Sequence, residues 1–417
     1  MIFLSFVGLG ILLLVLISFF RKLGATLPIP EFLLSIAGLQ WILGPILAYD
    51  SPVQHYKYHM YVSQEEYMAF VVPAYGVFAG IMLLLKKDIY ILGEQDLQKY
   101  SSFGKKILLI GILADVFNNF APASLGFFLF LLAQLKFIGA GLLLFSPSRK
   151  NRWFFYVAIA YLFISSLSNA MFHDFLLWGS FFFMIWALKY NPGFYKKLLI
   201  LLGALVLIIS IQTAKSAFRE QVWSGYQGDK ISLFIEILDR EFNNADFTQE
   251  TEQQDLNIRL NQGWIISAVM KEVPDNEPFA QGTTVQEAVS ASLLPRFLAP
   301  DKKTAGGQDN FMKYTGLDLG QNTSMGLSVL GEAYANFGGF GGIWFMFFYG
   351  LFLVIVWNKI ITISTEHPLL IFFIPLLFFQ VVKAETELVV VLNHLVKAGI
   401  TVVLFFWFSR KYLKWEI

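Results

Sequence analysis

The stretch Ser324–Phe345, SMGLSVLGEAYANFGGFGGIWF, begins with polar residues and continues as an apolar run of the kind that enters a membrane. It places a carboxylate, a phenol and an amide, on Glu332, Tyr334 and Asn336, directly before a group of glycines. A charged side chain inside a bilayer costs about 3 kcal/mol, so it usually faces a partner or a wet cavity. We therefore predict a membrane helix whose first residues include polar side chains that face a partner or a wet cavity.

The composition of the whole chain is that of a polytopic membrane protein. Of the 417 residues, 56% are hydrophobic and 15% are charged, whereas soluble domains have about 45–50% apolar and about 25% charged residues. Cysteine is absent from the sequence, which excludes disulfides, a thiolate nucleophile and a Cys-ligated metal. The expected fold class is therefore an all-α polytopic membrane protein.

Apolar windows of about 20 residues, the length that crosses a bilayer core, predict about eleven transmembrane helices. The sequence then divides into an N-terminal membrane bundle of eight spans (1–212), an extracytoplasmic loop subdomain (213–323) and a C-terminal membrane segment of three spans (324–417). The predicted spans lie near residues 2–20, 27–49, 67–85, 107–121, 123–146, 154–171, 174–189, 197–212, 326–357, 368–386 and 388–408.

Lysine and arginine are distributed unevenly between the predicted loops, and this distribution sets the orientation. With the N-terminus outside, the short outer loops contain only Lys57, while basic residues such as Arg21, Lys86, Arg149 and Arg410 fall on inner loops. The sequence thus predicts an extracytoplasmic N-terminus and large loop, and a cytoplasmic C-terminus.

The long outer segment is acidic overall, so it is not a surface for nucleic acid. Helical spacing of apolar residues predicts amphipathic helices over Lys230–Asn243 and Asp255–Lys271, both lying at the membrane interface. A third helix is predicted from a cap at Thr284 to Leu294, where Pro295 ends it.

Several basic residues of this region stand in apolar surroundings and are candidates for binding phosphate. Lys215 and Arg219 are four residues apart, so they share one helix face where the eighth span leaves the membrane. A guanidinium binds phosphate bidentately and keeps its charge. The alternative is that each side chain reaches the lipid headgroups or forms a surface ion pair. The further candidates are Arg259, Arg296 and Lys302.

Polar residues within the last predicted spans form a second set of candidates. In KAETELVVVLNHLVKAG, from Lys383 to Gly399, Glu387 and His394 are seven residues apart and share one helix face. Asp115 and Lys136 lie in the fourth and fifth spans, where an ion pair between neighbouring helices would account for both. A functional and a structural reading therefore remain open for these residues.

Three elements of the sequence resemble Wzy-type O-antigen and capsule polymerases. The opening stretch is similar to the Gly-Glu-X-Tyr-X-Asn-Phe-Gly element that begins a late helix in that family. The segment LLPRFLAPDKK, from Leu293 to Lys303, resembles the Pro-Arg…Pro-X-Lys element of its outer loop. The segment QTAKSAFRE, from Gln212 to Glu220, resembles the basic exit of the preceding helix. One departure is Lys303, which stands where the family often has proline.

The resemblance implies a membrane glycosyltransferase of the bacterial cytoplasmic membrane that needs neither a metal nor another cofactor. Its donor would be a glycan on undecaprenyl pyrophosphate, passed whole to the free end of another lipid-linked repeat unit. A sugar hydroxyl requires a general base, and a pyrophosphate leaving group requires fixed cations. The implied roles are Arg219, Arg259 and Arg296 for pyrophosphate, with Lys215 and Lys302 assisting; Glu332 as base, with Glu387 or His394 as second choices; and Tyr334 and Asn336 for the sugar.

Other readings of the same features remain. An O-antigen ligase would use the same donor with a different acceptor, and a transporter would move the lipid-linked unit across the membrane. Glu332 has a structural alternative as well, because a carboxylate at a helix entrance is stabilised there without any catalytic role. Under the polymerase reading the partners would be the lipid-linked donor and acceptor, the membrane lipids, a flippase and a chain-length regulator.

Overall fold

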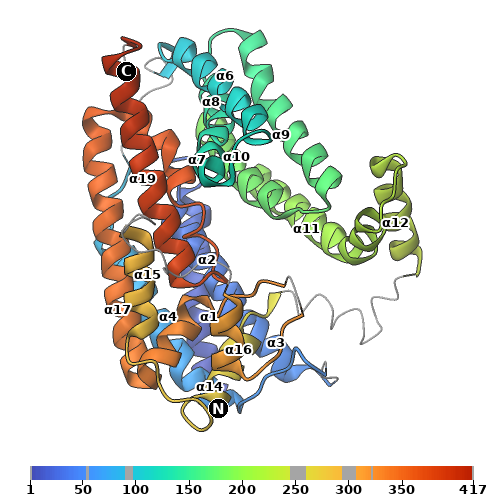
Figure 1. Cartoon of the computed structure of the whole chain (residues 1–417), viewed down its shortest axis with the longest axis vertical. Helices are drawn as coiled ribbons and strands as arrows, with labels where there is room; N and C mark the ends of the chain where they lie inside the picture. Colours follow the sequence, from blue (N-terminus) through green and yellow to red (C-terminus); the bar gives the residue numbers. More distant parts are fainter. Residues whose placement is uncertain are drawn as a thin grey trace.

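The structure is a computed structural model that describes residues 2–52, 56–89, 97–244, 260–293, 307–320 and 323–415. In these ranges the chain is helical and contains no β-strand (Figure 1). The first part comprises α1 (Ile2–Lys22), α2 (Ile29–Gly38), the π-helix η1 (Leu39–Leu43), α3 (Gly44–Asp50) and α4 (Gln64–Leu85).

The remaining helices follow in three groups. The central group comprises α6 (Ser101–Asn118), α7 (Ala123–Ala133), α8 (Leu135–Leu143), α9 (Arg149–Asn169), α10 (His173–Tyr190) and α11 (Phe194–Trp223). The next group comprises α12 (Lys230–Asn244), α14 (Gly263–Glu272), α15 (Thr283–Leu293) and α16 (Gln308–Thr315). The last group comprises α17 (Ser328–Glu366), the 3-10 helix η2 (Pro368–Phe373), α18 (Ile374–Leu377) and α19 (Leu388–Lys411).

Seven helical stretches within the described residues are long and apolar enough to cross a membrane. Helices α6, α9 and α10 coincide in position with three further predicted spans but are not among these seven. The prediction of a helix through 368–386 is wrong beyond Leu377, because turns occupy residues 378–387. The seven stretches are Phe3–Lys22, Ile29–Asp50, Gln64–Leu85, Leu125–Leu143, Phe194–Trp223, Ser328–Glu366 and Leu388–Lys411.

Close backbone contacts and ion pairs hold the bundle together. Helices α6 and α8 touch at Gly111, where an added Cβ would lie 2.1 Å from the backbone nitrogen of Lys136. The same two helices are joined by the pair predicted from the sequence, since Lys136 Nζ lies 2.6 Å from Asp115 Oδ2. The hydroxyl of Tyr161 in α9 also donates to Asp115, at 2.7 Å. The predicted ion pair between Asp115 and Lys136 is thus present.

A second ionic cluster, which the sequence did not predict, joins the ends of α1, α2 and α4. Glu31 is fully buried and pairs with Lys86, while Lys22 Nζ lies 3.3 Å from the same carboxylate oxygen. Lys22 also pairs with Asp88 at 2.8 Å. A buried carboxylate needs such partners, because an uncompensated charge in a protein interior is strongly destabilising.

The helices of the long loop segment agree only in part with the sequence-based predictions. Helix α12 has the predicted position; Phe234 of the predicted apolar face is buried, whereas Ile235 of the same face is exposed. Helix α14 was predicted to lie at the membrane interface, but all its residues from Gly263 to Met270 are buried against neighbouring helices. Helix α15 forms as predicted, although Thr284 lies inside its first turn. Residues 255–259 of the second prediction lie outside the described residues.

Helix α17, which contains the opening stretch, is broken at Gly338. The backbone there has φ 67° and ψ −166°, so 328–337 is a half-helix set off from the rest of α17. The break frees the carbonyls of Ala335 and Asn336, which accept hydrogen bonds from the N–H groups of Ala280 at 2.9 Å and Gln281 at 3.1 Å. The segment before α15 therefore replaces the missing turn of α17.

We expect Gly338→Ala to destabilise the protein by about 1–3 kcal/mol, because this backbone region is essentially restricted to glycine. An added Cβ would also lie 3.1 Å from the ring of Phe279. Gly339→Ala is the matched control, since its Cβ would meet nothing within 4 Å. Thermal unfolding of the purified variants measures the difference. Equal midpoints for the two variants would show that the break at Gly338 is not required.

Candidate active site

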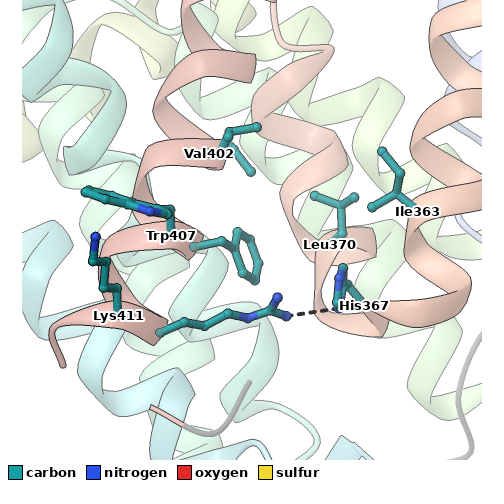
Figure 2. Close-up of a pocket in the computed structure, with 9 residues that line it drawn as sticks. Ile363, His367, Leu370, Val402, Trp407 and Lys411 are labelled. Atoms are coloured by element: carbon teal, nitrogen blue, oxygen red, sulfur yellow. Dashed lines mark hydrogen bonds between the residues drawn. The ribbon is translucent and has the colours of Figure 1, made fainter. Parts of the chain in front are cut away.

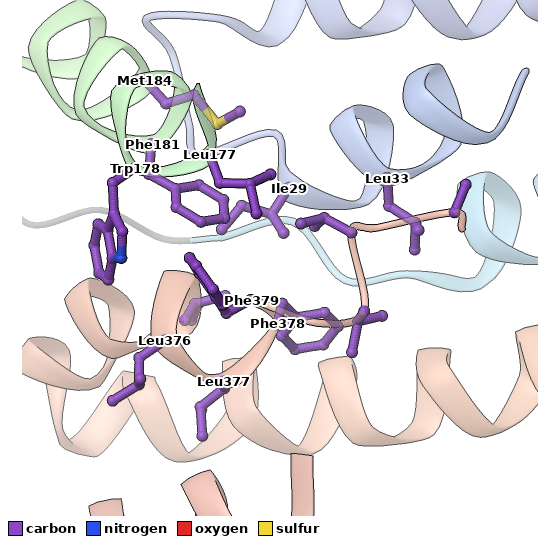
Figure 3. Packing of buried hydrophobic residues seen from close by; sticks show 14 of the residues in the cluster. Ile29, Leu33, Leu177, Trp178, Phe181, Met184, Leu376, Leu377, Phe378 and Phe379 are labelled. Carbon is purple, nitrogen blue, oxygen red and sulfur yellow. The ribbon is translucent and has the colours of Figure 1, made fainter. Parts of the chain in front are cut away.

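The irregular segment 378–387 lies between α18 and α19 and carries three charged residues, Lys383, Glu385 and Glu387. Its apolar side chains are buried: Phe379 packs against Trp178 and Phe181 of α10, with ring centroids 6.0 and 6.5 Å apart (Figure 3). Non-helical backbone among membrane helices is tolerated where it is buried in protein or lines a polar cavity. The segment is therefore a suitable place for a polar site.

Glu385 connects this segment to two other parts of the chain. Gln40 Nε2, in the π-helix η1, donates to Glu385 Oε2 at 3.2 Å. His173 Nδ1, at the first residue of α10, lies 4.0 Å from Glu385 Oε1. The side chains of Glu385 and His173 are accessible, with exposed fractions of 35% and 46%. Single π-helical turns are frequent at functional sites, so the meeting of these three side chains marks a candidate centre.

Two lysines act electrostatically on this centre. Lys383 and Lys215 both lie within electrostatic range of the His173 ring, and Lys383 is also within range of Asp174. The ammonium of Lys383 lies 4.8 Å from the centroid of the Phe379 ring. Amino groups and carboxylates from α10, α11 and segment 378–387 are thus gathered among apolar helices, where charged groups are retained at a high energetic cost.

Glu332 lies at the centre of a buried hydrogen-bond network. Its side chain is 2% exposed, and its two oxygens accept from the Thr284 hydroxyl at 2.6 Å and from the Leu388 N–H at 2.9 Å. Asn336 Nδ2 donates to Thr284 Oγ1 at 2.7 Å and to the Glu332 carbonyl at 2.8 Å. The carboxylate therefore joins α15, α17 and the N-terminus of α19, where the helix dipole favours a negative charge.

Glu387 stands directly before α19 and is also buried, with 3% of its side chain exposed. The neighbouring segment approaches it closely, since a Cβ on Gly326 would lie 3.3 Å from the backbone nitrogen of Glu387. Glu332 binds the next residue, Leu388, through its N–H. Two buried carboxylates are thus brought to the same helix entrance.

Two other candidates lie apart from this network. Tyr334 packs against Phe70 of α4 with ring centroids 5.1 Å apart, and makes no hydrogen bond to Glu332 or Asn336. His394 is buried within α19, where its Nε2 lies 2.8 Å from the Leu376 carbonyl. The His394 ring lies 6.0 Å from the Phe379 ring. The structure therefore groups Asn336 with Glu332, and separates Tyr334 and His394 from them.

Arg219 supports the corner between α9 and α11. Its Nη2 donates to the carbonyl of Ala170 at 3.3 Å, and its guanidinium lies 4.6 Å from the centroid of the Trp223 ring. Lys230 Nζ donates to the carbonyl of Ser168 at 2.7 Å. Cations at a helix C-terminus are favourable, so both side chains stabilise the end of α9. Lys215 lies one turn earlier in α11, within electrostatic range of His173.

The remaining candidates Arg259, Arg296 and Lys302 lie outside the described residues. Among the described residues, no group of three or more His, Cys, Asp or Glu side chains is arranged to hold a metal ion. Sequence reasoning did not select Gln40, Thr284, His173 or Lys383 as residues of the site, although it named Thr284 as a helix cap. Lys383 could have been found, because a lysine inside an apolar stretch such as 368–386 is costly and usually functional.

These features define a helical membrane protein with a charged, partly buried site at the entrance of its last helix. The model of a family described as a domain of unknown function (DUF8712) matches residues 52–413, so the chain belongs to that family. The match includes every site residue named above except Gln40. No curated protein and no solved structure matches the chain.

Proposed function

We propose that the protein is a glycosyltransferase that polymerises undecaprenyl-pyrophosphate-linked oligosaccharide repeat units at the outer face of the cytoplasmic membrane. The observation that supports this most is the pair of buried carboxylates, Glu332 and Glu387, at one helix entrance. The sequence elements that resemble Wzy-type polymerases include Glu332 and the exit of α11. The product would be O-antigen, capsule or exopolysaccharide.

In the proposed reaction, a carboxylate acts as the base that removes the proton from the acceptor hydroxyl. Glu332 is the first choice for the base, since its two hydrogen bonds hold the carboxylate in one orientation. The same bonds tie α15, α17 and α19 together, which would equally suit a purely positioning role. Glu385 beside His173 is the more accessible alternative. The activity and stability of Glu332 variants separate these roles.

In the proposed reaction, cationic side chains bind the pyrophosphate leaving group and stabilise its charge. Lys215 and Lys383 are described cations whose charges act on His173, and Arg219 follows Lys215 by one turn of α11. Charge that develops on a leaving group is stabilised by such fixed donors, and this stabilisation is often the main contribution to an enzyme's rate enhancement. Arg259, Arg296 and Lys302, outside the described residues, would complete the set.

A transporter of lipid-linked oligosaccharide is the second candidate, and one observation favours it. Transporter sites are often built from discontinuous helices near the middle of the membrane. Helix α17 is interrupted at Gly338, and the last membrane stretch is preceded by the irregular segment 378–387. An O-antigen ligase-like transferase is the third candidate and differs from the polymerase only in its acceptor.

One assay distinguishes the three candidates. The purified protein is given lipid-linked repeat units without divalent metal, and the products are resolved by length. A ladder of polymer supports the polymerase. Transfer that occurs only to a different acceptor indicates a ligase. Movement of the lipid across liposome membranes without any product indicates a transporter.

The topology gives a separate prediction. We expect extracytoplasmic signals from a reporter fused at Gly228, and cytoplasmic signals from reporters at Lys105 and at the C-terminus, because basic loops stay inside. Paired reporters that are active only on one side of the membrane measure this directly. A cytoplasmic signal at Gly228 would contradict the proposed function, since the loop would then face the wrong leaflet.

A further inference from the structure

A groove of about 510 Å³ lies between the end of α17, η2 and the end of α19 (Figure 2). The Glu332 network lies at the opposite ends of α17 and α19. It is apolar along its length and basic at one end. Trp407 is 49% exposed and Val403 is 67% exposed, so the groove opens to the side of the bundle. Its apolar lining consists of Ile363, Leu370, Val402, Val403, Phe406 and Trp407.

The basic end of the groove is formed by His367, Arg410 and Lys411. Arg410 Nη2 lies 2.9 Å from His367 Nδ1, which fixes the guanidinium at the mouth (Figure 2). Lys411 Nζ lies 5.1 Å from the centroid of the Trp407 ring. A guanidinium carries five N–H donors and keeps its charge, so this group suits the binding of an anion.

A second groove repeats this construction between α1 and α11. Its volume is about 570 Å³, and Arg21 and Lys197 lie at its edge. The aromatic rings of Phe20 and Phe194 meet in its wall with centroids 5.1 Å apart. Both grooves thus combine an apolar wall with two or more cations at helix ends.

We propose that the groove between α17 and α19 binds an anionic glycerophospholipid, with an acyl chain along the apolar wall and the phosphate at Arg410 and Lys411. The occupant follows from charge complementarity, since a hydrocarbon chain fits the apolar wall and an anionic headgroup complements the basic mouth. Each basic residue near an anionic lipid surface contributes about a fivefold preference. This site is independent of the proposed enzymatic function.

The test uses Trp407 of the purified full-length chain as the reporter. The protein is placed in detergent micelles, and phosphatidylglycerol or phosphatidylcholine with brominated acyl chains is titrated in. Bromine quenches nearby tryptophan fluorescence, and subtraction of the Trp407→Phe variant leaves the signal of Trp407 alone. We expect phosphatidylglycerol to quench this signal at roughly 25-fold lower mole fraction than phosphatidylcholine, about fivefold for each of two cations.

Variants identify the groove as the source of this preference. Arg410→Gln combined with Lys411→Gln should abolish it, and Val403→Phe should reduce quenching by both lipids because it narrows the groove. Arg149→Gln combined with Lys150→Gln is the charge-matched control at exposed positions of α9, and should keep the preference. In the single variant Lys411→Gln, at an exposed position, the preference for phosphatidylglycerol should fall about fivefold. This variant replaces the double variant if the double variant does not fold. Equal quenching by both lipids in the wild type, or the same loss in the control, would overturn the proposal.

Discussion

Glu332→Gln should give a folded protein that makes about 10²–10⁴-fold less polymer than the wild type, the usual contribution of a general base. Glutamine has the shape of glutamate and still accepts one of the two hydrogen bonds from Thr284 and Leu388. It cannot take the proton of an acceptor hydroxyl. Polymer length and amount, measured on purified protein, report the loss of activity.

Glu332→Ala serves as the comparison that separates catalysis from structure. Alanine leaves both buried donors without an acceptor, at a cost of about 1–3 kcal/mol each, so its unfolding temperature should fall clearly below that of the glutamine variant. If activity follows stability through the two variants, Glu332 positions the helices and is not the base. Near-normal polymer from Glu332→Gln would move the base to Glu387, Glu385 or His394.

Lys383→Met should lower polymer formation by about 10²–10³-fold, the range for loss of one fixed donor to a developing anion. Lipid-linked single repeat units should accumulate. Stability should change little, because methionine fills a similar volume and the neighbouring carboxylates Asp174 and Glu385 are accessible enough to be solvated. Activity and thermal unfolding are measured on the same preparation, so loss of function is separated from loss of fold.

The control for this prediction is Lys313→Met in α16. Lys313 pairs with Glu277 at 3.3 Å and is 53% exposed, so its surface ion pair contributes at most about 1 kcal/mol. We expect normal polymer from this variant. Polymer of wild-type length and amount from Lys383→Met would show that this lysine does not stabilise the leaving group. That role would then belong to Lys215 and the arginines.

The sequence predicted what depends on local composition and spacing. The pair of Asp115 and Lys136 was predictable because the two residues lie in predicted spans separated only by a tight turn, and such spans become neighbours in a hairpin. The helix over Lys230–Asn243 followed from its apolar spacing and is present as α12. Both features are set by residues near one another in the chain.

The errors arose where distant residues decide the structure. Residues 378–387 follow an apolar run and begin like a membrane helix, but Phe378 and Val382 are buried by other elements rather than by lipid, so hydropathy alone could not show the missing helix. Helix α14 has an amphipathic pattern, yet neighbouring helices cover its polar side as well. Glu332 was recognised as a candidate, whereas Thr284, its partner from 48 residues away, could not be identified without the fold.

The break at Gly338 has a mechanical consequence. Residues 280–282 supply N–H groups to the carbonyls of Ala335 and Asn336 and to the Asn336 side chain, and Thr284 binds Glu332 two residues further on. The half-helix 328–337 is therefore fastened to the start of α15 along its last turns, while a single glycine joins it to the rest of α17. A displacement of α15 by a bound ligand would be transmitted to the carboxylate of Glu332 without bending the rest of α17.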